Sequence, residues 1–455
     1  METPSWGIDP VPDRLRVLGF LDTTLLWANL SVSLLVIVAA AALVPALSLR
    51  EALLAVLLGA IAGNVLLGLA ATIGADARVP GMVVLRAPLG RRGSYVPTLL
   101  NVAQNLGWSI FELIVISTAA AALSKRLLGF EARSLWAVVF GVVTVVLAFL
   151  GPIGFVRRYV RKFAAWAVLA SLVYLTWWVL DKSNLHAFWH ARGHGGLSLG
   201  PGVDLVIGSV VSWTPLAADY TRFSRDRRSA GLGAGIGYFL PTLWCFGLGA
   251  LLVLARNVTS AEDVPAAVAT GTVVSALALL ALTVDESDEA FADVYSTAVS
   301  IQNVLPRVSQ RLLIVLVAAV ATAGAIVIDL RNYQTFLFLL GSVFVPLFGV
   351  LLADWLLRGA RYDERDVFAA PAWRIDQLAA WLVGFALYQW LSPQGPAWWT
   401  KLLAHLHPGH ATLTASLPSF AAAFVLATAA GLVLRRQDSA RAKARARREP
   451  LARPR

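Results

Sequence analysis

Long apolar stretches separated by short polar or basic segments make up most of this chain. The stretches are about 20 residues long, the length at which a helix crosses the hydrocarbon core of a bilayer. None shows the short apolar and polar alternation of an outer-membrane barrel strand. Twelve spans are predicted, near 24–46, 51–73, 96–124, 135–153, 163–180, 204–221, 231–255, 272–304, 312–329, 333–357, 375–392 and 413–434. The pattern therefore predicts an all-α polytopic membrane protein.

The stretch 272–304 departs from this pattern, because acidic and polar residues follow its apolar start. These residues are Asp285, Glu286, Asp288, Glu289, Asp293, Ser296, Thr297, Ser300 and Gln302. Carboxylates within a membrane span normally face a bundle interior or a wet cavity, since burial in lipid is costly. We expect Asp293 and Asp288 to lie at a binding centre, and Asp285 and Glu286 to line a solvated vestibule.

The span near 96–124 carries a second polar cluster. Asn101, Gln104, Trp108 and Glu112 follow one another at spacings of three, four and four residues. This spacing places them on one face of a helix. The face should point inward, because a glutamate in mid-span cannot face lipid cheaply.

Two further spans have features that interrupt a helix. The first span holds Asn29 and Ser33 in its first half, and the sixth holds Ser212, Trp213 and Pro215. Proline removes a backbone donor, so we expect the sixth helix to break near Pro215. Interrupted helices at corresponding positions of two halves indicate an inverted-repeat secondary transporter with a site near the bilayer midplane.

Composition and charge support the membrane assignment. Of 455 residues, 58% are hydrophobic and 14% are charged, and the mean hydropathy is +0.69. A soluble domain normally has about a quarter charged residues. Most of the 38 Lys and Arg residues fall on one side of the predicted spans, which places both termini in the cytoplasm and the chain in the plasma (inner) membrane. The net charge of +11 is thus explained without nucleic acid as a partner.

Three segments are predicted along the chain. Residues 1–22 form a cytoplasmic N-terminal segment that lacks the pattern of a cleaved leader. Residues 23–434 form the twelve-helix domain, with helices 1–5 at about 24–180, helices 6–10 at about 204–357 and helices 11–12 at about 375–434. The basic tail 435–455 has almost no core-forming residues, and we expect it to be disordered and to lie on anionic lipid.

The polar positions favour recognition of a flat ligand. An apolar plane together with a few hydrogen-bonding groups at the edge fixes a planar molecule. Trp108 and Trp213 offer planes, although each could instead serve in packing. Glu112 could accept a hydrogen bond from the substrate, carry a proton, or pair with a buried donor. Ser296 and Thr297 could bind a small hard cation, or could bond back to their own helix.

Other chemistries find little support. Cys245 is the single cysteine, so neither an intramolecular disulfide nor a cysteine metal cluster can form. His186, His190 and His194 have helical spacing but no acidic or cysteine partner nearby, and we predict no metal site there. Hydrolase, metalloprotease and P-loop signatures are absent from the sequence. No cofactor is expected apart from Na⁺ as a coupling ion.

Four segments resemble the nucleobase:cation symporter-1 family, on its bacterial cytosine permease side. They are GMVVLRAPLGRRGSYVP, IGSVVSWTPLAADYTRFSR, FADVYSTAVSIQNV and FLLGSVFVPLFGVLLADWLL, and they occur in the family's order. The resemblance extends from Gly7 to about Leu434. It implies a leucine-transporter-like fold, with helices 1–5 and 6–10 as inverted repeats and two further C-terminal helices.

The resemblance also implies roles for particular residues. The family's stacking tryptophan falls on Trp108, and a polar position that is an amide in some members falls on Glu112. Amides of the eighth helix fall around Ala292 and Asp293, and cation-binding hydroxyls fall on Ser296 and Thr297. The aromatic residue that usually completes the sandwich aligns with Val210, so Trp213 is its expected substitute.

We therefore predict cation-coupled import, with Na⁺ or H⁺, of a nucleobase such as cytosine or a purine by alternating access. The predicted substrate-binding residues are Gln104, Trp108, Glu112, Ser212, Trp213, Asp288, Asp293 and Gln302, and the predicted cation-binding residues are Asn29, Ser33, Ser296 and Thr297. Hydroxymethylpyrimidine, to whose carriers the SWTPLAADYTRF pattern is similar, is an alternative substrate. An amino-acid transporter of the same fold, a membrane-embedded enzyme and a channel are less favoured alternatives. The oligomeric state is left open.

Overall fold

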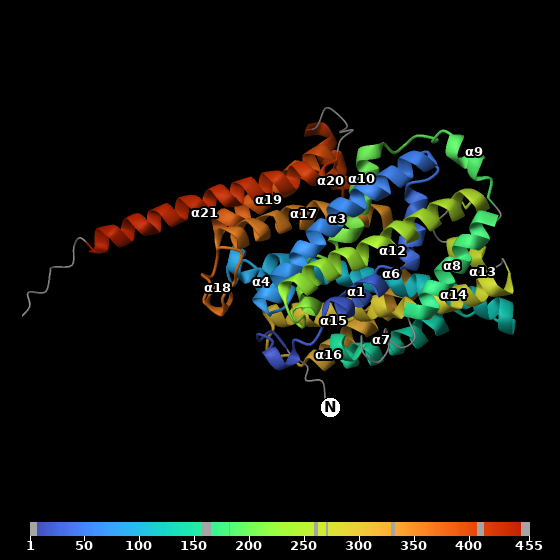
Figure 1. The fold of residues 1–455 in the computed structure, drawn as a ribbon, viewed down its shortest axis with the longest axis horizontal. Helices are drawn as coiled ribbons and strands as arrows, with labels where there is room; N and C mark the ends of the chain where they lie inside the picture. The colour runs from blue at the N-terminus through green and yellow to red at the C-terminus, as the bar shows by residue number, and fades with distance from the viewer. Residues whose placement is uncertain are drawn as a thin grey trace, which may run out of the picture.

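Helices form nearly all of the regular structure in the computed structural model (Figure 1). The structure describes residues 7–155, 165–181, 183–258, 263–269, 272–328, 333–406 and 414–446. Among these residues, the one β-type pairing is an isolated bridge between Leu18 and Ser224. The prediction of an all-α membrane protein agrees with this architecture.

The helices follow one another with short connections. The first half contains η1 (Asp13–Leu15), α1 (Phe20–Asn29), α2 (Leu34–Ala39), η2 (Ala40–Ala42), α3 (Leu49–Ala77), α4 (Gly81–Val84), α5 (Arg86–Leu89), α6 (Tyr95–Leu128), α7 (Arg133–Phe155), α8 (Ala165–Asp181), α9 (Leu185–His190), α10 (Leu199–Val211) and α11 (Ala217–Thr221). The second half contains α12 (Arg227–Arg256), α13 (Val264–Ala269), α14 (Val273–Asp285), α15 (Ser287–Val304), α16 (Gln310–Val327), α17 (Tyr333–Leu357), α18 (Glu364–Phe368), α19 (Ile375–Leu391), α20 (Ala397–Leu406) and α21 (Ser416–Ala446).

Helix lies in each of the twelve ranges predicted to span the membrane, within the part of the chain that the structure describes. By length and apolar composition, 7 helices can cross a membrane, or up to 8 if the bent pair Phe20–Asn29 and Leu34–Ala42 counts as one span. The other predicted spans are divided into shorter helices or carry more polar residues. Twelve crossings therefore remain a prediction.

The first span is broken as its polar residues predict. α1 ends at Asn29, α2 begins at Leu34, and the two helical segments are bent by 53°. Ser33 stands at the N-cap of α2 and accepts hydrogen bonds from the amides of Leu35 and Val36. A hydroxyl in this position satisfies amides that have no partner within the helix.

The sixth span is broken around Pro215, which confirms the expected interruption. α10 ends at Val211 and α11 begins at Ala217. The connection has no room for a side chain at since a Cβ there would lie 1.9 Å from the carbonyl oxygen of Pro215. The Gly81 amide also donates to Asp219 of α11 at 2.9 Å, which ties the start of α4 to the broken helix.

The acidic span 272–304 is almost continuous. A single turn residue, Glu286, separates α14 from α15. The amide of Glu286 donates to the carbonyl of Leu282, and the amide of Ala290 donates to the carbonyl of Glu286, so helical bonding crosses the interruption. The acidic side chains before and after Glu286 therefore keep helical spacing.

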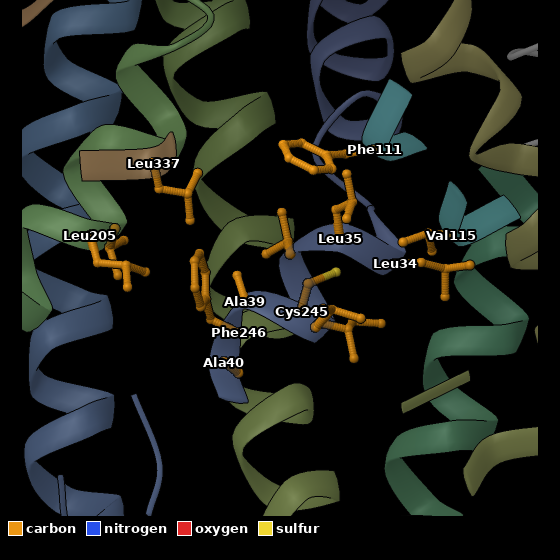
Figure 2. Packing of buried hydrophobic residues seen from close by; sticks show 14 of the residues in the cluster. Leu34, Leu35, Ala39, Ala40, Phe111, Val115, Leu205, Cys245, Phe246 and Leu337 are labelled. Carbon is orange, nitrogen blue, oxygen red and sulfur yellow. The ribbon is translucent and has the colours of Figure 1, made fainter. Parts of the chain in front are cut away.

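The short helix α2 lies in the centre of the packed bundle. All six of its residues are buried. Figure 2 shows Leu34, Leu35 and Ala39 of this segment close to Phe111 of α6 and to Cys245 and Phe246 of α12. α12 also packs along α3 and α1, and in Figure 1 it runs beside α3 through the middle of the molecule. Helices that pack around α2 hold the break of the first span in place.

The end of the chain differs in part from the prediction for the tail. α21 continues to Ala446, so the first part of the basic segment 435–455 is helical rather than without secondary structure. In Figure 1 this helix extends beyond the bundle. Residues 447–455 lie outside the described residues. Alanine and arginine both favour helix, which explains how a helix can continue past the apolar residues.

Candidate functional site

The break of the first span faces the acidic residues of α14 and α15. The side-chain amide of Asn29 donates to Asp285 at 3.2 Å and to Asp288 at 2.5 Å. Asn29 Oδ1, Asp285 Oδ2 and Asp288 Oδ1 are buried and have no hydrogen-bond partner among the described residues. Two carboxylates and an amide oxygen provide the oxygen ligands that a small hard cation prefers.

Glu286 closes the same break from the other side. Its carboxylate accepts hydrogen bonds from Ser33 Oγ at 2.8 Å and from the amides of Leu34 at 2.7 Å and Leu35 at 3.2 Å. The N-terminus of a helix carries partial positive charge and unpaired amides, so a carboxylate is favourable there. Glu286 thus holds α2 against α15.

The expectation that Asp285 and Glu286 line a solvated vestibule is wrong. The two side chains are only 2% and 1% exposed, and both bond to the break of the first span. The sequence places these residues next to deeper polar positions but does not show which helix packs over them. The fold of α1 and α2 onto α14 and α15 buries them.

A small cavity lies beside these acids. It is lined by Ser33, Leu35 and Val36 of the first span, Trp108 and Glu112 of α6, Ser209, Ser212, Trp213 and Leu216 around the break of the sixth span, Tyr238 of α12, and Glu289 and Asp293 of α15. The cavity therefore joins the two broken spans to α6 and α15. Trp108, Glu112, Ser212, Trp213, Asp293 and Ser33 are brought together here from the predicted set.

Aromatic side chains form much of the cavity wall. The ring of Trp108 packs edge-on against Phe336 of α17, with centroids 5.3 Å apart. Trp213 lies 5.9 Å from the ring of Tyr238 and 5.9 Å from that of Trp27. Indole planes of this kind offer stacking surfaces to a flat ligand. Two of the planes, Trp108 and Trp213, come from opposite elements of the site.

Val210 does not line this cavity. It is fully buried, and it packs against Gly63 of α3, where a Cβ would lie 2.7 Å from the Cβ of Val210. The break that follows α10 turns the chain, and Trp213 reaches the cavity instead. The geometry is consistent with the prediction that Trp213 takes the place of the aromatic residue absent at Val210.

Three carboxyl groups of the site lie close together. Ligand atoms of Glu112, Glu286 and Glu289 all lie within 4.8 Å of one another, and all three residues are buried. The spacing of Glu286, Glu289 and Asp293 by three and four residues puts them on one face of α15. That spacing is visible in the sequence, and it could have identified Glu289, which is absent from the predicted site. Ser209 and Tyr238 also line the cavity without having been predicted.

Two predicted substrate-binding residues have other contacts. The side-chain amide of Gln104 donates to Asn101 at 3.0 Å and to the carbonyl oxygen of Ser212 at 2.9 Å. Gln104 thus supports the break of the sixth span from behind. Gln302 donates to the carbonyl of Val308 at 3.0 Å, near the end of α15. Neither residue lines the cavity.

Asp288, also predicted to bind substrate, faces Asn29 rather than the cavity. The four predicted cation-binding residues form two separate groups. Asn29 and Ser33 contact the acids of α14 and α15. Ser296 lies 3.3 Å from the hydroxyl of Tyr220, and Thr297 donates to the carbonyl of Asp293 in its own helix at 2.7 Å. These two hydroxyls thus bond within α11 and α15 and do not meet the first span.

The N-terminal segment closes one end of the bundle. The backbone of Leu18 exchanges hydrogen bonds with Phe223 and Arg225, just after α11. Arg16 donates to the carbonyl oxygens of Ser224 at 3.0 Å and Ala75 at 3.2 Å. These contacts link the start of the chain to the ends of α3 and α11. A path from the cavity to this end of the bundle requires that they separate.

Comparison with known proteins gives the family. A sequence model described as "permease for cytosine/purines, uracil, thiamine, allantoin" matches residues 10–430. The cytosine permease of Escherichia coli strain K12 is 26% identical over 351 residues, which is 76% of this chain and 80% of that protein. The hydantoin permease of Microbacterium maritypicum is 26% identical over 170 residues, or 37% of this chain and 34% of that protein.

Among solved structures, this fold is similar to that of a nucleobase-cation-symport-1 transporter in a closed conformation with bromovinylhydantoin bound. The TM-score is 0.77 at 20% identity, with coverage of 96% of this chain and 95% of that chain. The match over nearly the whole length confirms the fold class that the resemblance implies. These findings establish a multi-pass membrane transporter and not an enzyme. The chain belongs to the family of permeases for cytosine and purines, uracil, thiamine and allantoin, the nucleobase-cation-symport-1 transporters.

Proposed function

We propose that this protein imports a nucleobase or a closely related planar nitrogen heterocycle, coupled to Na⁺ or H⁺. The observation that carries the proposal is the cavity between the two broken spans, in which Trp108 and Trp213 lie with hydrogen-bonding groups of Ser212, Glu112 and Asp293. The relatives named above, a cytosine permease and a hydantoin permease, support the same substrate class. Hydroxymethylpyrimidine is the alternative substrate.

In this proposal the indoles of Trp108 and Trp213 hold the ring, and Glu112 and Asp293 bond to its edge. The five-plus-five inverted repeat and the twelve crossings then provide alternating access, with both termini in the cytoplasm of a cell whose plasma (inner) membrane holds the protein. Opening toward the cytoplasm separates the contacts of Arg16 and Leu18 with the end of the sixth span. Opening to the outside admits the substrate to the same cavity.

The coupling cation is proposed to bind at Asn29, Asp285 and Asp288. Their unpartnered oxygens lie on the break of the first span and on its partner helix, next to the substrate cavity. A cation there would tie the first span to α14 and α15 and so favour one arrangement of the broken helices. Ser296 and Thr297 are left outside this site, because their hydroxyls bond within α11 and α15.

Uptake into proteoliposomes tests the proposed function. We expect labelled cytosine, hypoxanthine, uracil or hydroxymethylpyrimidine to accumulate above the external concentration when an inward Na⁺ or H⁺ gradient is imposed, and to equilibrate without it. Liposomes without protein provide the control. If none of the four compounds is concentrated under either gradient, the importer proposal fails.

Replacement of Asp288 by asparagine tests the cation site. Asparagine keeps the shape and removes one of two carboxylates from the site, so we expect accumulation to fall by about tenfold or more while substrate binding in saturating cation is retained. Asp204→Asn is a matched control, since Asp204 is equally buried and instead accepts hydrogen bonds from the amides of Ala415 and Ser416. Equal loss of accumulation in both variants would contradict the assignment.

An amino-acid substrate is less compatible with the cavity. Amino acids carry a carboxylate, and Glu112, Glu289 and Asp293 all line the cavity. Like charges at close range repel. This arrangement favours the heterocycle over the amino acid within the same fold.

A further inference from the structure

The charge of the substrate cavity is one-sided. Its described lining contains three carboxyl groups, from Glu112, Glu289 and Asp293, and no Lys, Arg or His. A buried carboxylate without a positive partner is strongly unfavourable. The balance must therefore come from protons or from the molecule that occupies the cavity.

Unused hydrogen-bonding capacity points into the same space. Glu112 Oε2 and Glu289 Oε1 are buried and have no partner in the described part of the chain, and the two residues are 1% and 4% exposed. The carboxyl group of Asp293, 4% exposed, accepts no hydrogen bond from a described residue either. Such groups are rare in folded proteins, and each calls for a missing partner. The free atoms are all acceptors when ionised, so the missing partner is a donor.

Glu286 does not supply that donor. Ligand atoms of Glu112 and Glu289 lie within 4.8 Å of its carboxylate. The Glu286 carboxylate is already occupied by the donors of Ser33, Leu34 and Leu35. It adds negative charge behind the cavity and leaves Glu112 and Glu289 to the ligand.

The aromatic walls decide between a metal ion and an organic cation. Three carboxylates alone could bind a divalent metal. A metal ion makes no use of the indoles of Trp108 and Trp213, which line the same cavity. A flat cation uses both features, because aromatic faces attract positive charge and carboxylates accept paired N–H donors.

From this geometry we infer that the substrate is an amino-substituted nitrogen heterocycle bound as a cation. Its protonated amidine edge donates paired N–H bonds to Glu112, with Glu289 and Asp293 completing the negative surround, while Trp108 and Trp213 face the ring. The inference rests on the proposed function and narrows its substrate class. Neutral oxo heterocycles of the same size should bind poorly, since they lack both the charge and the donor pair.

Binding to purified full-length protein tests this inference with two matched pairs. One pair is 4-aminopyridine, a cation at neutral pH, and neutral 4-pyridone. The other is 5-hydroxymethyl-2-methylpyrimidine with a 4-amino or a 4-oxo group. We expect the amino member of each pair to bind about tenfold or more tightly than its oxo counterpart, as charge-assisted hydrogen bonds are stronger than neutral ones. Calorimetry or ligand-induced thermal stabilisation measures the ratio.

The variant Glu112→Gln tests the role of the charge. It keeps the size and one acceptor but adds a donor where the amidine edge donates, so the preference for the amino member should fall by about tenfold toward equality. Glu51→Gln is the matched control and should keep the wild-type ratio, because Glu51 is exposed and bonds to Ser48 at the start of α3.

The outcomes separate the inference from the proposed function. If the oxo members bind as tightly as the amino members, or if Glu112→Gln leaves the preference unchanged, the inference fails and heterocycle transport stands. Binding of MnCl₂ in place of the heterocycles would overturn the inference in favour of a metal site. If no heterocycle of either pair binds and none is taken up by proteoliposomes, both the inference and the proposed function fail.

Discussion

Replacement of Glu286 by leucine should destabilise the protein by about 3 kcal/mol or more, because buried donors lose their acceptor. The carboxylate accepts from Ser33 Oγ and from the amides of Leu34 and Leu35. The amide of Leu35 also reaches Ser33 Oγ at 3.0 Å, but the structure prints no second acceptor for that of Leu34. The midpoint of thermal unfolding in detergent measures the effect.

Two further variants separate the cap from a general effect of losing an acid. Glu286→Gln keeps an acceptor near the start of α2, so a smaller decrease in unfolding temperature is expected. Glu51→Leu removes a comparable contact at the start of α3, where Glu51 accepts from the amide of Ser48 at 3.0 Å. Because Glu51 is exposed, water replaces the lost acceptor and the decrease should be small. Decreases of equal size in Glu286→Leu and Glu51→Leu would refute the role of Glu286 as a buried cap.

Replacement of Trp108 by alanine should weaken substrate binding by one to two orders of magnitude. Stacking of a heterocyclic base on an aromatic side chain is worth about 1–3 kcal/mol. Trp108 lines the cavity, and Phe336 holds its ring in position through an edge contact with centroids 5.3 Å apart. The dissociation constant of whichever heterocycle is concentrated in proteoliposomes is the quantity to measure.

Matched variants distinguish stacking from general loss of packing. Trp108→Phe retains a plane and should recover most of the affinity. Trp136→Ala removes a tryptophan that packs on Phe130 and donates to Ser124, outside the cavity lining. It should lower stability without changing affinity. An affinity in Trp108→Ala equal to that of the wild type would show that the indole of Trp108 does not contact the substrate.

Patterns along the chain identify much of the site before any tertiary contact is known. Trp108 and Glu112 were expected on an inward face of one helix, and both line the cavity. The same stripe also contains Gln104, which instead supports the carbonyl of Ser212. Helical spacing shows which residues share a face, but neighbouring helices decide where the cavity lies along that face. The break near Pro215 was predictable because proline disrupts helical bonding within its own helix.

The acidic span shows where such reasoning stops. Its five carboxylates have similar local sequence, yet Asp285 and Asp288 meet Asn29, Glu286 caps α2, and Glu289 and Asp293 line the cavity. The partner of each acid comes from an element about 250 residues earlier in the chain for Asn29 and Ser33, whose contacts span 256 and 253 positions. A pattern within one helix carries no information about such partners.

By itself, the sequence determined the membrane class, the helical ranges, the two polar interruptions and the family resemblance, since these depend on apolar length, local backbone preferences and motifs. Only the tertiary structure decided which acid has which partner. It replaced Ser296 and Thr297 with Asp285 and Asp288 as the oxygen groups beside Asn29, and it placed Trp213 rather than Val210 at the cavity. The physical reason is that burial and pairing of a charge depend on groups brought together by packing, whereas helix formation and membrane insertion depend mainly on neighbours along the chain.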